Sequence, residues 1–161
     1  ADARTVLSWL AALGEDAAPE KMVLLGHSMG AYAVIHAAAS APQPKVSGVI
    51  AVSPVVSGSA LLEARQAMGE AAISLLRDEL PQAFEEWPTH GLADIAPRVS
   101  VPAAVIVGAD DSITPPADAM TLAGWLPACV WRDVIPGEHH CPTGEAFSQS
   151  LDAALDRIAP G

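Results

Sequence analysis

Gly26-His27-Ser28-Met29-Gly30 stands between the short apolar run Met22-Val23-Leu24-Leu25 and an alanine-rich stretch over residues 31–41. The apolar run is typical of a buried strand, and the alanine-rich stretch is typical of a helix. The sequence therefore predicts a strand, a sharp turn and a helix, with Ser28 at the apex of the turn. A serine in this place stands clear of its own backbone, as a nucleophile must.

The neighbours of Ser28 fit the same interpretation. Gly26 and Gly30 have no Cβ, so we expect them to let the strand and the helix approach each other closely. The backbone N–H of Met29, at the start of the helix, would face an oxyanion that forms beside Ser28. A Gly-x-Ser-x-Gly pentapeptide also occurs by chance, and a serine here can simply cap the helix.

Two later segments supply an aspartate and a histidine, each after a further apolar run. Residues 102–107 precede Gly108-Ala109-Asp110-Asp111-Ser112-Ile113-Thr114-Pro115, and residues 129–135 precede Pro136-Gly137-Glu138-His139-His140. A serine hydroxyl is unreactive at neutral pH unless a base lies within hydrogen-bond reach. A histidine base in turn needs an acid that orients its ring. The chain thus contains the three groups that catalysis by a serine requires.

In the order serine, aspartate, histidine, the chain resembles the α/β-hydrolase superfamily from its first residues to its last. The motifs that carry the resemblance are GHSMG, G-x-x-D-x-x-x-P beginning at Gly108, and P-G-x-x-H beginning at Pro136. The resemblance implies a three-layer α/β fold with a parallel sheet. It also implies that Ser28 is the nucleophile, that His140 is the base and that Asp111 orients the imidazole. Such enzymes require neither a cofactor nor a metal.

At two of these positions an adjacent residue is the alternative. Counting along the motifs selects His140 over His139 as the base, and Asp111 over Asp110 as the orienting acid. Asp110 would then form the turn. His139 would line the substrate pocket or pack on a neighbour.

Other side chains are candidates for the walls of that pocket. His27 precedes the nucleophile, and we interpret it as a packed neighbour rather than a catalytic group. Phe84 and Trp87 would form either an apolar roof over the pocket or the interior of a separate helical unit.

Strands and helices alternate along most of the chain, which predicts a parallel sheet. The expected elements are a helix over residues 3–13, strands over residues 21–26, 45–53, 101–107 and 130–135, and helices over residues 29–40, 116–126 and 143–158.

The alternation is interrupted between residues 54 and 98, where helical periods take over. In hydrolases that this chain resembles, an insertion at this point forms a helical cap over the active site. An ordinary crossover helix with a long loop is the alternative, but about 40 residues exceed what one crossover needs. We therefore expect three parts: the nucleophile part of the core (residues 1–53), a small helical cap (residues 54–98), and the part of the core with the aspartate and the histidine (residues 99–161).

The resemblance also implies several strands before the nucleophile, and the loop after one of them provides the second oxyanion-hole donor. Here Ser28 follows a single predicted helix, so we expect roughly the carboxy-terminal two-thirds of the resembled domain. Three explanations are open: an incomplete sequence, which we favour; a split enzyme whose second polypeptide completes the sheet; or a minimal hydrolase with a different oxyanion hole. In the first two, the nucleophile strand leaves one edge of the sheet open.

Composition narrows the class of partner. The 161 residues have a net charge of −11 with only eight Lys and Arg, which argues against nucleic acid and anionic membranes as partners. No apolar run reaches the roughly 20 residues of a membrane span. Cys129 and Cys141 make no disulfide framework, and a cytoplasmic location is the expectation.

These features predict hydrolysis of an ester or thioester of a small, mainly apolar acyl group through an acyl-enzyme on Ser28. The same triad also serves C–C bond hydrolases, perhydrolases (haloperoxidases) and acyltransferases, and the fold alone does not separate them. A non-catalytic receptor or fragment is the third class. The pocket separates the first two classes, and reaction with a fluorophosphonate separates the first from the third.

Overall fold

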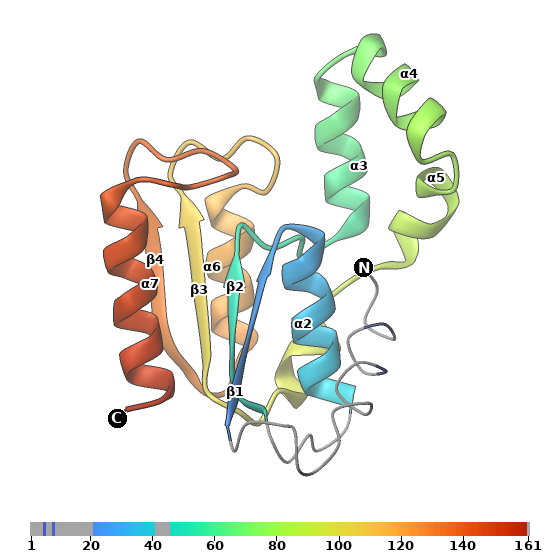
Figure 1. The fold of residues 1–161 in the computed structure, drawn as a ribbon. Helices are drawn as coiled ribbons and strands as arrows, with labels where there is room; N and C mark the ends of the chain where they lie inside the picture. The colour runs from blue at the N-terminus through green and yellow to red at the C-terminus, as the bar shows by residue number, and fades with distance from the viewer. Residues whose placement is uncertain (1–4, 6–7, 9–20, 41–45, 161) are drawn as a thin grey trace.

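The structure of the chain, a computed structural model, describes residues 5, 8, 21–40 and 46–160. Its strands form a parallel sheet of four, ordered as they follow along the chain (Figure 1). They are β1 (Met22–His27), β2 (Val46–Val52), β3 (Ala103–Gly108) and β4 (Cys129–Ile135). The predicted α/β fold with a parallel sheet is confirmed. The helix expected over residues 3–13 lies outside the described residues, except for residues 5 and 8.

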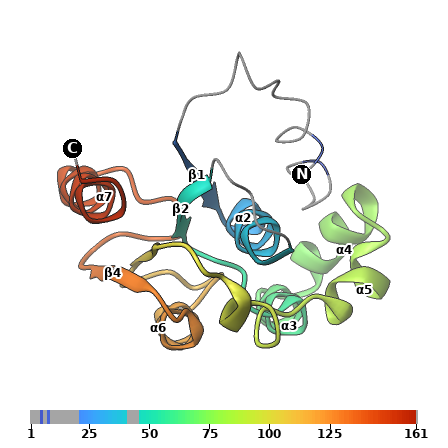
Figure 2. The same cartoon turned by 90° about the horizontal axis from the view of Figure 1, so that it is seen from below.

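In the described part of the chain, three helices cover the two faces of this sheet (Figures 1 and 2). Helices α2 (Met29–Ser40) and α6 (Pro116–Trp125) pack on one face, and α7 (Glu145–Ile158) packs on the other. Consecutive strand residues point to opposite faces, so Val49 joins the core under α2 and α6, whereas Ile50 joins the core under α7. Burial on both faces explains why the central strands β2 and β3 are nearly continuous apolar runs.

The parallel arrangement brings the candidate site together. His27, at the end of β1, pairs with Val52, at the end of β2, and β3 and β4 run in the same direction. The carboxyl ends of all four strands therefore lie at one edge of the sheet. The segments that follow β1, β3 and β4 contain Ser28, Asp111 and His140 in turn.

The segment between β2 and β3 forms short helices that extend beyond the carboxyl ends of the strands (Figure 1). The two ends of the helical part of this segment lie side by side. Ser57 and Gly91 form an antiparallel bridge, and the Leu92 N–H donates to the Val56 carbonyl oxygen at 3.0 Å. The Ser57 hydroxyl accepts from the Ala60 N–H and caps the first of these helices. The elements beyond the strands are α3 (Gly58–Ala67), α4 (Glu70–Glu79), α5 (Ala83–Glu86) and η1 (Trp87–Thr89). After the chain returns, η2 (Ala96–Arg98) packs with α2 and α6.

Strand β1 lies at the margin of the described sheet, since it pairs with β2 and with no other described strand. Leu25, in the middle of β1, is half exposed. Within the described part of the chain, no helix has both the length and the apolar character that crossing a membrane demands.

Candidate active site

The turn after β1 holds Ser28 in the strained conformation that the pentapeptide predicts. Its φ is +56°, in the left-handed region that non-glycine residues rarely adopt. Main-chain bonds stabilise this turn; among them, the Ser28 N–H donates to the Val52 carbonyl oxygen at 2.9 Å, and the Ser28 carbonyl accepts from the Ala31 N–H at 3.0 Å. The Ser28 side chain therefore projects from a rigid turn.

The two glycines of the turn differ in their surroundings. A Cβ on Gly26 would collide with the backbone of Gly30 and Ala31, so the close approach of strand and helix requires this glycine. A Cβ on Gly30 would meet nothing, because the space around it is open. The expectation that both glycines permit the close approach is therefore correct for Gly26 and wrong for Gly30. The contact is made by the Gly30 backbone, which any residue would present.

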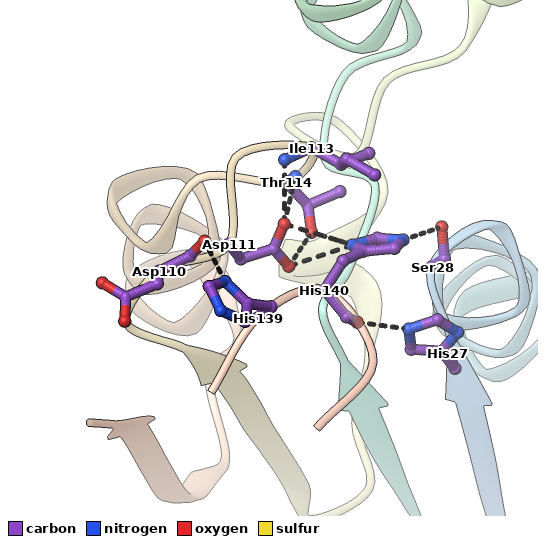
Figure 3. A network of polar contacts seen from close by, with 8 residues as sticks. All are labelled: His27, Ser28, Asp110, Asp111, Ile113, Thr114, His139 and His140. Atoms are coloured by element: carbon purple, nitrogen blue, oxygen red, sulfur yellow. Dashed lines mark hydrogen bonds and ion pairs between the residues drawn. The ribbon is translucent and has the colours of Figure 1, made fainter. Parts of the chain in front are cut away.

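Ser28 and His140 lie within hydrogen-bond distance, although 112 positions separate them in the chain (Figure 3). The distance from Ser28 Oγ to His140 Nε2 is 3.1 Å, and the opposite ring nitrogen, Nδ1, lies 3.0 Å from Asp111 Oδ2. A carboxylate can only accept, so the neutral ring carries its proton on Nδ1 and leaves Nε2 free to accept the serine proton. The His140 side chain is 18% exposed, whereas the Asp111 side chain is fully buried.

Asp111 is held as a carboxylate by the loop in which it lies. Its Oδ1 accepts from the N–H groups of Ile113 at 2.9 Å and Thr114 at 2.8 Å, and its Oδ2 accepts from the Thr114 hydroxyl at 2.7 Å. Burial raises the pKa of this carboxyl, but the bonds from Thr114, His140 and Ile113 outweigh burial and lower the pKa below its ordinary value. The group opposite His140 Nδ1 is therefore negatively charged at neutral pH.

Other contacts fix the loop that carries His140. The Glu138 carboxylate accepts from the N–H groups of Thr143 at 3.2 Å and Gly144 at 2.9 Å, just before α7 begins. The Glu138 carbonyl accepts from the Asp110 N–H at 3.0 Å, and a Cβ on Gly108 would collide with the same carbonyl. These contacts join the loop after β4 to the loop after β3.

The two alternative residues lie elsewhere in the structure. The His139 ring is exposed, and its Nδ1 lies 3.1 Å from the Asp110 carbonyl oxygen, to which it donates (Figure 3). No described contact joins His139 or the Asp110 carboxylate to Ser28. The spacing argument and the geometry therefore select the same pair, His140 and Asp111.

The remaining pocket candidates are not all at this site. His27 lies at the site, because its Nε2 is 2.6 Å from the His140 carbonyl oxygen. Phe84 and Trp87 are half-buried among the helices between β2 and β3, where the Arg77 guanidinium lies 5.4 Å from the Phe84 ring centre. No described hydrogen bond or ring contact joins either aromatic residue to Ser28 or His140. Among the described residues, no group of three or more His, Cys, Asp or Glu is arranged to hold a metal ion.

Two residues with a role at this site escaped the sequence-based reasoning. Thr114 contacts both the acid and the base, since its hydroxyl donates to Asp111 Oδ2 and also lies 3.2 Å from His140 Nδ1. Its position three residues after Asp111 is the usual spacing of a side chain that closes such a turn, and this could have revealed it. Glu138 gives no comparable signal in the sequence. Its carboxylate accepts from main-chain N–H groups five and six residues later, and such contacts have no fixed spacing.

Comparison with known families supports the same class of protein. A family model described as serine hydrolase matches residues 3–141. A comparison with curated proteins finds no match.

Solved structures with a similar fold include two esterases or lipases and a phospholipase. A bacterial membrane phospholipase A, described as a virulence factor, is 17% identical with a TM-score of 0.74, and the match covers 100% of this chain and 65% of that one. An esterase from Thermogutta terrifontis is 20% identical with a TM-score of 0.59, covering 86% of this chain and 66% of that one. A monoacylglycerol lipase from Paleococcus ferrophilus is 21% identical with a TM-score of 0.62, and the match covers 98% of this chain and 74% of that one. The chain thus spans about two thirds of the first two proteins. At these low sequence identities, the similarity to the solved structures shows the fold alone.

Proposed function

Because the chain belongs to the serine hydrolase family and has the α/β-hydrolase fold, we propose that it hydrolyses an ester or thioester of a small, mainly apolar acyl group through an acyl-enzyme on Ser28. The observation that carries this proposal is the continuous chain of contacts from Ser28 Oγ through the His140 ring to the buried Asp111 carboxylate.

Each group has a role that its partners support. Ser28 Oγ attacks the carbonyl carbon of the substrate while its proton passes to His140 Nε2, and the resulting imidazolium gives that proton to the leaving alcohol or thiol. Asp111 keeps the other ring proton on Nδ1 and stabilises the imidazolium. Water then attacks the acyl-enzyme by the same route and releases the acid.

The backbone of the turn favours the negatively charged intermediate. Met29 is the first residue of α2, so its N–H has no acceptor within the helix and is available to an oxyanion beside Ser28. The positive end of the helix dipole adds to the same effect.

A small cavity beside the Asp111 loop is the place that we propose for a short acyl group; its lining includes Thr114 but none of Ser28, Met29 and His140. It lies between the segment after β2 and the Asp111 loop, has a volume of about 40 Å³ and is lined chiefly by apolar side chains, among them Val55, Val56, Leu61 and Ile113. We assign the helices of residues 54–98 as a cap over this side of the site, since α3 supplies one wall of the cavity.

Replacement of the nucleophile tests the proposal. Ser28→Ala lowers kcat for p-nitrophenyl acetate by about 10⁴- to 10⁶-fold, because the covalent route is lost. Ser148→Ala is the matched control, since it removes an exposed hydroxyl from α7, on the opposite face of the sheet, and leaves kcat unchanged. A folded Ser28→Ala protein that keeps a tenth of the activity would falsify the assignment.

A further inference from the structure

His27 makes a direct contact with the residue that carries the base. Its Nε2 lies 2.6 Å from the main-chain carbonyl oxygen of His140, and the centres of the two rings are 4.8 Å apart with a tilt of 54° (Figure 3). A carbonyl oxygen can only accept, so His27 donates from Nε2. His27 is therefore more than the packed neighbour that the sequence suggests.

The position of this bond in the loop distinguishes it from the other loop contacts. The bonds from Asp110 to Glu138, and from Thr143 and Gly144 to Glu138, hold the loop on the β3 and α7 sides. The bond from His27 holds residue 140 itself, and it does so from the strand that ends next to the nucleophile. One short segment thus places Ser28 and also supports the backbone of its partner.

We propose that His27 is a positioning residue, which fixes the backbone of His140 so that the imidazole Nε2 stays within hydrogen-bond distance of Ser28 Oγ. This inference rests on the proposed function, because it assigns His140 the role of base. The geometry between nucleophile and base is sensitive, since a displacement of about 1 Å can cost about 100-fold in rate. The loss of a single neutral hydrogen bond should lower the rate by less, about threefold to tenfold.

The contribution of the donor can be separated from that of the ring. His27→Phe keeps an aromatic ring beside His140 and removes the donor. His27→Gln removes the ring and keeps an N–H of similar reach. His36→Phe is the matched control, because His36 contacts Ser40 and Tyr32 on α2 and no residue of the His140 loop.

The experiment measures steady-state hydrolysis of p-nitrophenyl acetate and the rate of the acylation burst. We expect His27→Phe to lower the acylation rate and kcat by about tenfold with KM within about twofold, because the substrate pocket is intact while the base is displaced. His27→Gln recovers most of the loss, and His36→Phe behaves as the parent protein does. In the proton NMR spectrum, the His140 Nδ1–H signal is retained in the Gln variant and exchanges faster with water in the Phe variant.

Two results overturn the inference. One is a His27→Phe protein with the parent acylation rate; the other is a Gln variant as slow as the Phe variant while both have the parent melting temperature. Ser28→Ala, measured alongside, separates this failure from failure of the proposed function. If Ser28→Ala is inactive and His27→Phe is fully active, only the positioning role is lost. Should the Phe variant fold poorly, His27→Asn, which shortens the donor's reach, takes its place with the same expected loss of acylation rate.

Discussion

At the scale of single residues, the partners of each polar atom determine which member of each adjacent pair can act. His140 has Ser28 on one ring nitrogen and Asp111 on the other, whereas the His139 ring is exposed and bonds to a main-chain carbonyl. The Asp111 carboxylate is buried and bonded, and no contact joins the Asp110 carboxylate to the site.

These differences predict a clear ranking of variants. His140→Ala lowers kcat as severely as Ser28→Ala does, whereas His139→Ala costs about tenfold or less, through the shape of the loop. Asp111→Asn is likewise far more damaging than Asp110→Asn, because an amide at position 111 no longer stabilises the imidazolium. Steady-state kinetics on the four purified variants measures the ranking, and the reverse order within either pair would reassign that role.

The lowered pKa of Asp111 also predicts how stability depends on pH. Its pKa is lower in the folded chain than in the unfolded chain, so the ionised carboxylate stabilises the fold above its ordinary pKa of about 3.9. This contribution is lost as the pH falls through the lowered folded value. In urea unfolding, Asp111→Asn should therefore be less stable than the parent near neutral pH, and the difference should shrink below about pH 4. A difference that is constant over this range contradicts the assignment of a stabilising carboxylate.

The sequence was sufficient to predict that Ser28, Asp111 and His140 lie together, because each follows a strand within a short motif. It was not sufficient for His27 and Glu138, whose partners are main-chain groups of a distant or irregular loop. Main-chain carbonyls and N–H groups have no signature in the sequence, so only the folded loop reveals such contacts.

At the scale of elements, the bounds of β2 and β3 could be predicted because these central strands are buried on both faces and are apolar runs between polar or turn residues. Strand β4, with Arg132 and Asp133 in its middle, is more exposed. Helix α7 begins at Glu145, two residues later than expected, with Gly144 as its N-cap. The N–H groups of Thr143 and Gly144, just before the helix, donate to the Glu138 carboxylate. The residue pattern predicts the helix but does not encode this contact to Glu138.

The turn between β1 and α2 gives a prediction from its two glycines. Gly26→Ala should lower the free energy of unfolding by about 1–3 kcal/mol, because the new methyl group meets backbone atoms that cannot move aside. Gly30→Ala should change it by less than about 1 kcal/mol, because the space is open and alanine favours a helix. Urea denaturation of the two variants provides the comparison, and equal losses would mean that the turn relaxes around either methyl group.

The cavity beside α3 gives a second prediction at this scale. Ile113→Ala enlarges it, so the ratio of kcat/KM for p-nitrophenyl butyrate to that for the acetate should rise severalfold. The ratio within one variant does not depend on how much of the protein is folded. Val130→Ala, on the exposed side of β4, is the control. An unchanged ratio in Ile113→Ala would show that the acyl chain binds elsewhere.

At the scale of the whole molecule, the site exists only because the sheet is folded. Ser28, Asp111 and His140 come from three segments, and the parallel strands carry all of them to one edge. The acidic composition has no visible role in this arrangement, since the described ion pair is the one between His140 and Asp111. If Ser28 is the nucleophile that we propose, its reactivity depends on the folded sheet and not on its pentapeptide alone.

Covalent labelling tests this claim most directly. The folded protein is treated with a fluorophosphonate, digested, and searched by mass spectrometry for the modified residue. We predict an adduct on Ser28, strongly reduced in His140→Ala and absent when the protein is unfolded in urea before treatment, because the base then no longer lies beside the hydroxyl. An adduct on another serine, or equal labelling of Ser28 in the folded and unfolded protein, would contradict the account.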